Sequence, residues 1–217
     1  MIKNVIFDFD GTIVNSRALI VKLYNELAER YGFKYIQDNE IEQLSELSIP
    51  NRCKALGVPV HRVPQLGLQA KSRYQHLIGE LESNPGLKDL ILRLREAGYN
   101  LTIISSNLEP SIRAFLVHND IEGFDSVYSA KNFFGKHRTI HSFLKKNGIP
   151  VNEAVYIGDE LRDIEACRKI EMQIISVSWG YDSAKLLEKS NPSLMAYRPE
   201  DIFGALEKLN RSEQIQK

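Results

Sequence analysis

Cysteine is scarce in this sequence, and its scarcity excludes two kinds of protein. Among the 217 residues only Cys53 and Cys167 occur, and they form no CxxC pair. A secreted domain held together by a disulfide framework needs more cysteines, and so does a zinc site built from thiolates. We therefore expect a protein of a reducing compartment, the cytoplasm, with a conventional hydrophobic core.

Long hydrophobic runs and an excess of charge of one sign are also missing. The longest apolar runs, such as residues 5–7, span a few residues, whereas a membrane-spanning helix needs about 20. The 28 Lys and Arg residues balance 28 Asp and Glu residues, so no overall field favours nucleic acid or an anionic membrane. The first residues lack the pattern of a signal peptide. We expect a soluble, cytoplasmic monomer or homodimer without a nucleic-acid or membrane partner.

Short apolar runs that alternate with helical patterns are what the sequence does contain. Each run ends in a turn signal, and helical periodicity follows, as in a parallel sheet with crossover helices. The length suits one core domain with a smaller insertion. The sequence therefore predicts an α/β fold with a doubly wound, Rossmann-like parallel sheet. The predicted strands are residues 5–9, 101–104, 126–128, 154–157 and 174–177.

One long interval interrupts this alternation. Residues 15–82 show helical periodicity almost throughout, beginning with Leu19, Leu23 and Leu27. Residues 14–16 and 83–86 are rich in Ser, Asn, Pro and Gly, which favour turns. We predict a small all-helical cap domain at residues 15–82, inserted into a core formed by residues 1–14 and 83–217.

Two acidic side chains follow the first predicted strand. The segment reads Asp8-Phe9-Asp10-Gly11-Thr12, and the carboxyl end of a parallel strand opens onto the ligand crevice. Residues two apart on a strand share a face, which would place Asp8 and Asp10 together. The alternative is an ordinary surface turn, because Asp and Gly are common turn residues.

A second acidic group, Asp159, Glu160 and Asp163, follows the strand at residues 154–157. Several carboxylates in one crevice repel each other unless a cation neutralises them. Oxygen ligands without Cys or His favour Mg²⁺ over zinc. The alternative is a helix N-terminus with acids that complement its dipole. That alternative accounts for Glu160 and Asp163 but not for Asp159.

Polar residues also follow the strand at 101–104. A hydroxyl and free amides at Ser105, Ser106 and Asn107 could form a phosphate site before a helix that starts near Pro110. Helix capping without a ligand is the alternative, and for Asn107 it is the interpretation that we favour. Lys136 precedes another predicted helix; a solvated lysine is the default there, and only its position between the other motifs singles it out.

The order DFDGT, ISS, GK before a helix and GDExxD resembles the motif signature of the haloacid-dehalogenase (HAD) superfamily. The stretches NPGLKDLILRLREAGYNLTIISSN and AVYIGDELRDIEACRK are similar to phosphoglycolate-phosphatase-like members of that superfamily. The resemblance implies a Mg²⁺-dependent phosphatase with a helical cap. The second acid argues against carbon–halogen chemistry, because haloacid dehalogenases lack both that acid and the metal.

The resemblance also implies roles for individual residues. Asp8 would be the nucleophile that forms an aspartyl phosphate, and Asp10 the general acid and then base, its pKa raised by a negative neighbour. Ser105 and Lys136 would bind the phosphoryl oxygens. The remaining expectations concern the metal and the substrate. Mg²⁺ would be held by Asp8, Asp10 (through its carbonyl) and Asp159, with Glu160 and Asp163 in an outer shell, and the substrate would contact Thr12, Ser106 and Asn107.

Basic residues are concentrated in one part of the predicted cap. Residues 51–79 contain no Asp or Glu but several Lys and Arg, Arg52 and Arg62 among them. We hypothesise that some of them, Arg52 first, face the core and attract an anionic substrate. The alternative is a solvated helix face.

The function that we predict is hydrolysis of a small phosphate monoester, such as a phosphoglycolate-like metabolite. A phosphomutase of the same superfamily is one alternative. A non-catalytic phosphate-binding module is the other. Response-regulator receivers also group acids, a hydroxyl and a lysine, but they lack the DxDGT spacing and the insertion after the first strand.

Overall fold

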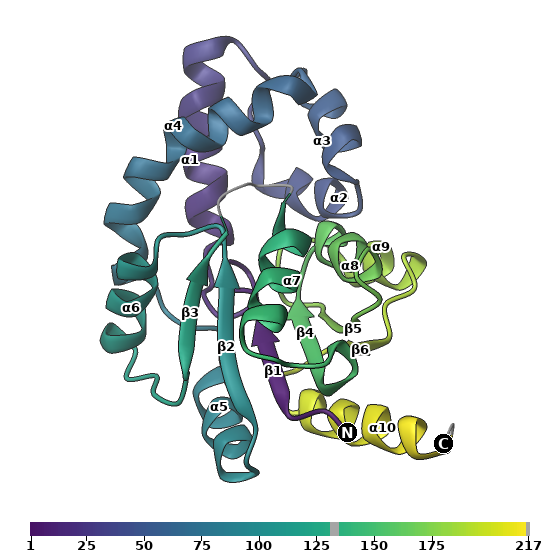
Figure 1. The fold of residues 1–217 in the computed structure, drawn as a ribbon. Coiled ribbons are helices and arrows are strands. Elements are labelled where there is room, and N and C mark those ends of the chain that lie inside the picture. The colour runs from purple at the N-terminus through teal and green to yellow at the C-terminus, as the bar shows by residue number, and fades with distance from the viewer. Residues whose placement is uncertain (131–134, 216–217) are drawn as a thin grey trace.

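The computed structural model describes residues 1–130 and 135–215, and a parallel sheet lies at its centre (Figure 1). Its six strands are ordered β3-β2-β1-β4-β5-β6, and every neighbouring pair is parallel. The order reverses between β1 and β4, which confirms the doubly wound α/β fold. The strands are β1 Asn4–Phe7, β2 Asn100–Ser105, β3 Ser126–Ser129, β4 Ala154–Gly158, β5 Gln173–Val177 and β6 Leu194–Ala196.

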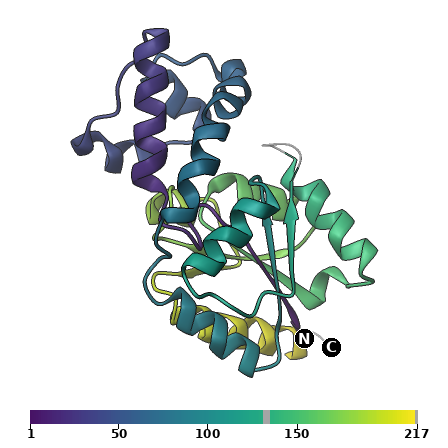
Figure 2. The same cartoon turned by 90° about the vertical axis from the view of Figure 1, so that its left-hand side faces the viewer.

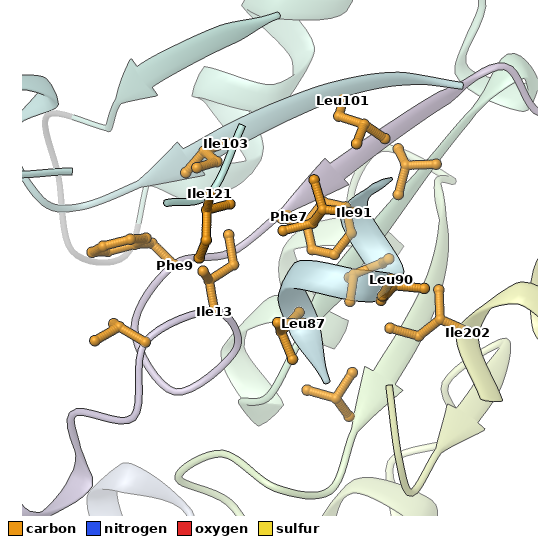
Figure 3. Close-up of a cluster of buried hydrophobic side chains, with 14 of the residues drawn as sticks. Phe7, Phe9, Ile13, Leu87, Leu90, Ile91, Leu101, Ile103, Ile121 and Ile202 are labelled. Atoms are coloured by element: carbon orange, nitrogen blue, oxygen red, sulfur yellow. The ribbon is translucent and has the colours of Figure 1, made fainter. Parts of the chain in front are cut away.

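Helices cover both faces of this sheet, because alternate residues of the strands point to opposite sides. Val5 and Phe7 pack into one hydrophobic cluster with residues of α5, α6 and α10, and Ile6 packs into another with residues of α7 and α8. Figure 2 shows α5 and α10 on one side of the sheet, and Figure 3 shows Phe7 against Ile91 of α5. The helices are α5 Leu87–Glu96, α6 Glu109–His118, α7 Lys136–Lys146, α8 Leu161–Arg168, α9 Ala184–Lys189 and α10 Asp201–Ile215.

The segment predicted as a cap is helical. It lies beyond the carboxyl ends of the strands in Figure 1, and it has a small hydrophobic cluster of its own around Leu44, Cys53, Leu56 and Val58. Its independence as a domain stays a prediction. Its longer helices are α1 Arg17–Tyr31, α2 Ile41–Ser45, α3 Ile49–Ala55 and α4 Val63–Leu77, and its short 3-10 turns are η1 Asp38–Glu40, η2 Val60–Arg62 and η3 Ile78–Glu80.

The two chain crossings into this segment lie side by side. Asn15 N donates to Glu82 O at 3.1 Å, and Asn84 N donates to Ile13 O at 2.8 Å. The Asn84 side-chain amide also donates to the carbonyls of Gly11 and Thr12 at 3.0 and 3.1 Å. These bonds tie the start and end of the helical segment to the loop that carries the first acidic motif.

Both cysteines are buried and free. Cys53 lies in the helical segment and Cys167 in α8, and no disulfide joins them. Among the described residues, no helix combines the length and the apolar character that a membrane crossing requires.

Candidate active site

Asp8 lies immediately beyond β1, at the carboxyl edge of the sheet. Its main-chain N donates to Ile157 O of β4 at 2.8 Å, so it still follows the strand ladder. The residue is 2% exposed. The Lys136 ammonium donates to Asp8 Oδ2 and to Asp163 Oδ1, each at 2.6 Å. The structure therefore brings together residues from three of the four motifs, and Lys136 is buried rather than solvated.

Asp10 follows two residues later and is held by donors from two other elements. The Asn107 amide donates to both carboxylate oxygens, at 2.9 Å to Oδ1 and 2.7 Å to Oδ2. The Tyr74 hydroxyl of α4 also donates to Oδ1. Burial is the main reason that the pKa of Asp10 is raised to about 6, with a smaller contribution from Asp8. The sequence had suggested the negative neighbour as the cause, so the larger cause was missed.

The Asp159 side chain packs closely against two glycines. A Cβ atom at Gly11 or at Gly180 would lie 2.2 Å from the Asp159 side chain, so both positions require glycine. Asp159 Oδ1 accepts from the Thr12 hydroxyl and Oδ2 from Tyr181 N, each at 2.7 Å. Burial and the charge of Glu160 raise the pKa of Asp159 well above its usual value. The Thr12 hydroxyl, predicted to bind substrate, is fully buried and engaged with Asp159.

Among the described residues, the group of acids that could share one ion differs in part from the predicted metal ligands. Carboxylate oxygens of Asp8, Glu160 and Asp163 lie within 4.8 Å of one another. The sequence placed Glu160 and Asp163 in an outer shell and Asp159 next to the ion. An all-oxygen set fits Mg²⁺ rather than zinc, so the residues present suit the predicted ion.

The charge balance of this cluster also favours a cation. Two basic side chains face the acids, Lys136 and the largely buried Arg162, which binds Glu160 Oε2 through its Nε at 2.7 Å. These two positive charges do not balance the acids around them, and buried carboxylates that remain unpaired are unfavourable. Four buried acids lie here: Asp8, Glu160 and Asp163 of the cluster, and the neighbouring Asp159.

The polar turn after β2 is arranged differently from the interpretation that we favoured. The N-cap of α6 is Leu108, not Asn107, so the capping interpretation of Asn107 is wrong: its side chain binds Asp10 instead. Ser105 is fully buried at the end of β2, and its Oγ accepts from Asn107 N at 3.1 Å. Ser106 is half-buried at the same turn. Their predicted contacts with phosphate stay predictions.

Arg52 of α3 contacts the core at a different point. Its guanidinium donates to the carbonyls of Leu44 and Leu47 at 3.0 Å and to Asp182 Oδ1 at 2.7 Å. Asp182 Oδ2 in turn accepts from Leu161 N, at the start of α8, at 2.7 Å. Arg52 thus bridges the helical segment to the core, and its predicted contact with substrate stays a prediction.

Several residues of the site were not predicted from the sequence. Arg162 and Tyr181 had a signal, because Arg162 lies inside GDExxD and Tyr181 lies shortly after the predicted strand at residues 174–177. Tyr74 had none. Its helix has the ordinary periodicity of an amphipathic segment, which does not indicate that one tyrosine reaches a carboxylate 64 positions earlier.

Comparison with known proteins agrees with this geometry. Residues 5–177 match the family model described as haloacid dehalogenase-like hydrolase. Phosphoglycolate phosphatase of Synechococcus elongatus is 29% identical over 208 residues, which cover 95% of this chain and 98% of that protein. Pyrophosphatase PpaX of Listeria monocytogenes is 24% identical, with coverage of 93% and 95%.

The solved structures that resemble this one include a haloacid dehalogenase-like hydrolase from Streptococcus pneumoniae. It superposes with a TM-score of 0.77 at 20% identity and covers 94% of this chain and 98% of that one. The fold, the order of the motifs and the family match over residues 5–177 lead to one conclusion. The chain belongs to the haloacid dehalogenase-like hydrolase family.

Proposed function

We propose that this protein hydrolyses a small phosphate monoester through an aspartyl phosphate on Asp8, with Mg²⁺ as cofactor. The observation that carries the proposal is the buried contact of Lys136 with Asp8 at 2.6 Å, with Asp10 two residues away. A lysine beside the nucleophile can bind the phosphoryl oxygens, and the second acid can exchange protons with the leaving group.

The reaction has two steps. In the first, an Asp8 oxygen bonds to phosphorus while the bond from phosphorus to the ester oxygen breaks, and Asp10 gives that oxygen a proton. In the second, Asp10 takes a proton from water, whose oxygen attacks phosphorus and releases Asp8 and inorganic phosphate. Lys136 offsets negative charge on the transferring group throughout.

Mg²⁺ would screen Asp8 from the phosphate and stabilise the charge that develops during transfer. Asp8 belongs to both candidate ligand sets. One set adds the Asp10 carbonyl and Asp159, and the other adds Glu160 and Asp163, whose oxygens lie within 4.8 Å of Asp8. Both sets consist of oxygen donors alone.

The helical segment would serve as a cap, with residues 15–82 as its domain and the paired crossings at residues 14–16 and 83–86 as hinges. The partner that this chemistry requires is a small phosphorylated metabolite. Phosphoglycolate is the first ester to test because the Synechococcus relative is named for it. The two free, buried thiols fit a reducing cytoplasm.

Phosphate release with and without Mg²⁺ tests the proposal. We expect turnover of at least one small ester by the wild type, and a loss of about 100-fold or more in Asp8→Asn and Asp10→Asn, because each variant removes a covalent or acid–base step. Rapid quenching with a ³²P-labelled ester should trap label on the wild type and none on Asp8→Asn. Label that persists in Asp8→Asn would place the nucleophile elsewhere.

A further inference from the structure

We propose that Tyr74 is a positioning residue, which orients the Asp10 carboxylate for proton transfer to the leaving group. The inference rests on the proposed role of Asp10 as general acid. The helical segment contains none of the four sequence motifs, and the inference gives it a part in the reaction.

The position of Tyr74 in α4 is unusual for that helix. Of the α4 residues 63–77, all of which the structure describes, Tyr74 is the one that is buried, and it is 5% exposed. Its ring belongs to the same hydrophobic cluster as Leu19 and Leu23 of α1 and Ile78 of η3. The ring is therefore held by packing, and the hydroxyl at its tip has a fixed position.

That hydroxyl contacts Asp10 from the helical segment, whereas the other side-chain donor to Asp10 lies in the core. Asn107, in the turn after β2, donates to both Asp10 oxygens through one amide nitrogen. Tyr74 adds a second donor on Oδ1 from the opposite chain segment, α4. Two donors on different elements restrict rotation of the carboxylate about its own axis better than one nitrogen does, and proton transfer depends on that orientation.

Further hydroxyl groups connect this region to Asp159, one of the candidate metal ligands. Ser16, at the first chain crossing, is fully buried, and its Oγ lies 2.5 Å from the Tyr181 hydroxyl. Tyr181 N holds Asp159 Oδ2 at 2.7 Å. The helical segment therefore contacts Asp10 directly through Tyr74, whereas its first crossing is connected to Asp159 only through Tyr181.

The dependence on the leaving group separates positioning of an acid from general damage. An alkyl phosphate releases a basic alkoxide that needs a proton, whereas p-nitrophenyl phosphate releases a stable anion that needs little help. A variant that only misplaces Asp10 should therefore lose kcat/KM on the first ester and keep it on the second, because kcat/KM reports the step that expels the leaving group and not the later hydrolysis of the aspartyl phosphate, which both esters share. A variant that loosens the fold should lose both.

The experiment compares kcat/KM of Tyr74→Phe and wild type on phosphoglycolate, or the best alkyl ester found, and on p-nitrophenyl phosphate. The phenylalanine keeps the packed ring and removes only the hydroxyl. We expect kcat/KM for the alkyl ester to fall about tenfold, a fraction of what a general acid contributes. We expect kcat/KM for p-nitrophenyl phosphate to change less than about threefold, because expulsion of that leaving group needs little acid catalysis.

Two further variants complete the design. Tyr31→Phe removes another hydroxyl of the helical segment, which donates to Gln69 of α4 at 2.9 Å, and should leave both rates unchanged. Asp10→Asn should show the same selectivity between esters on a larger scale. Equal losses on both esters, or no loss on either, in Tyr74→Phe would overturn the proposal. An Asp10→Asn variant without selectivity would instead remove the general acid on which the proposal rests.

Discussion

Asp159 depends on two residues that have no side chain. Gly180 does not have a positive φ angle, so glycine is needed there for space and not for backbone conformation. A Cβ at this position would lie 2.2 Å from the Asp159 carboxylate. The neighbouring Tyr181 N is one of the two donors that orient this carboxylate. A single added methyl group therefore tests how closely the site depends on Asp159.

We expect Gly180→Ala to displace Asp159 and to destabilise the fold by about 1–3 kcal/mol, as overpacking in a core does. Because supporting contacts tune metal ligands, activity or metal affinity should fall about 10- to 100-fold. The measurements are the melting temperature and the Mg²⁺ concentration that gives half-maximal activity.

Gly204 provides the matched control. It lies on α10, and a Cβ there would meet nothing within 4 Å. Gly204→Ala should leave Mg²⁺ dependence unchanged and stabilise the helix by about 0.5–1 kcal/mol. A Gly180→Ala protein with wild-type Mg²⁺ dependence would show that Asp159 is not needed for metal binding.

For single residues, the sequence was a better guide to which charged residues belong to the site than to which side chains contact one another. Asp8, Asp159 and Lys136 follow strands, and strand ends meet at one edge of a parallel sheet, so their convergence was predictable. The binding of Asn107 to Asp10 was not, because a capping residue and a side chain that reaches across a turn look alike in sequence. The partner of Tyr74 depends on how α4 packs, and helical periodicity does not give that information.

At the scale of elements, the region of α2 and α3 contacts the loop before α9 and the first turn of α9 at three points. Ser183 N donates to Ser45 O at 3.0 Å, Lys185 pairs with Glu46 at 2.7 Å, and Arg52 pairs with Asp182 at 2.7 Å. The Arg52–Asp182 pair differs from the exposed Lys185–Glu46 pair because Asp182 is buried and its carboxylate also accepts a hydrogen bond from Leu161 N of α8. It therefore connects the helical segment to the loop that carries the second acidic motif.

We expect Arg52→Ala to destabilise the protein by about 1–3 kcal/mol, because it leaves a buried carboxylate without its charged partner. The α2–α3 region should also become more sensitive to protease, since it loses its buried link to the core. Unfolding in urea and limited proteolysis followed by mass spectrometry measure the two effects.

Lys185→Ala serves as the control at the same interface. The Lys185–Glu46 pair is exposed, with side chains 60% and 39% accessible, and such pairs contribute about 0–1 kcal/mol. Equal effects of the two substitutions would contradict a special role for the buried pair.

Among the elements, the strands with strong apolar runs were predictable and the weakest was not. All five predicted strands are present, within a few residues of the expected bounds. The edge strand β6, Leu194–Ala196, was missed because it has three residues, two of them only partly buried. An edge strand pairs with one neighbouring strand and buries fewer side chains, so few of its residues have to be apolar and its sequence pattern is weak.

At the scale of the whole molecule, zero net charge conceals a strong local imbalance. Burial raises the pKa of Asp8 and of Asp10 to about 6, from 3.8 in an exposed side chain. The unfolded chain therefore releases these protons near pH 4, and the folded chain retains them until about pH 6. The metal-free protein should lose stability as pH rises through that window.

This linkage predicts how Mg²⁺ affects the melting temperature. We expect the increase caused by Mg²⁺ to be larger at pH 7.5, where the acids are ionised and repel one another, than at pH 5, where protons already neutralise part of the cluster. Thermal unfolding at both pH values, with Mg²⁺ and with chelator, provides the measurement.

Asp8→Asn is the internal comparison, because Asp8 belongs to both candidate ligand sets. It should be more stable than wild type in chelator at pH 7.5, since it removes one repelling charge, and should gain less from Mg²⁺. An equal Mg²⁺ effect at both pH values in the wild type would contradict binding by this acidic cluster.

The two buried cysteines make this protein convenient for measuring motion. Burial raises the pKa of the Cys53 and Cys167 thiols, so both should react slowly with maleimides, which attack thiolates. One new exposed cysteine in α4 and one in α7 could then carry a fluorophore pair with little background labelling. Energy transfer between them would report, molecule by molecule, whether the helical segment changes its distance from the sheet when a phosphate ester binds.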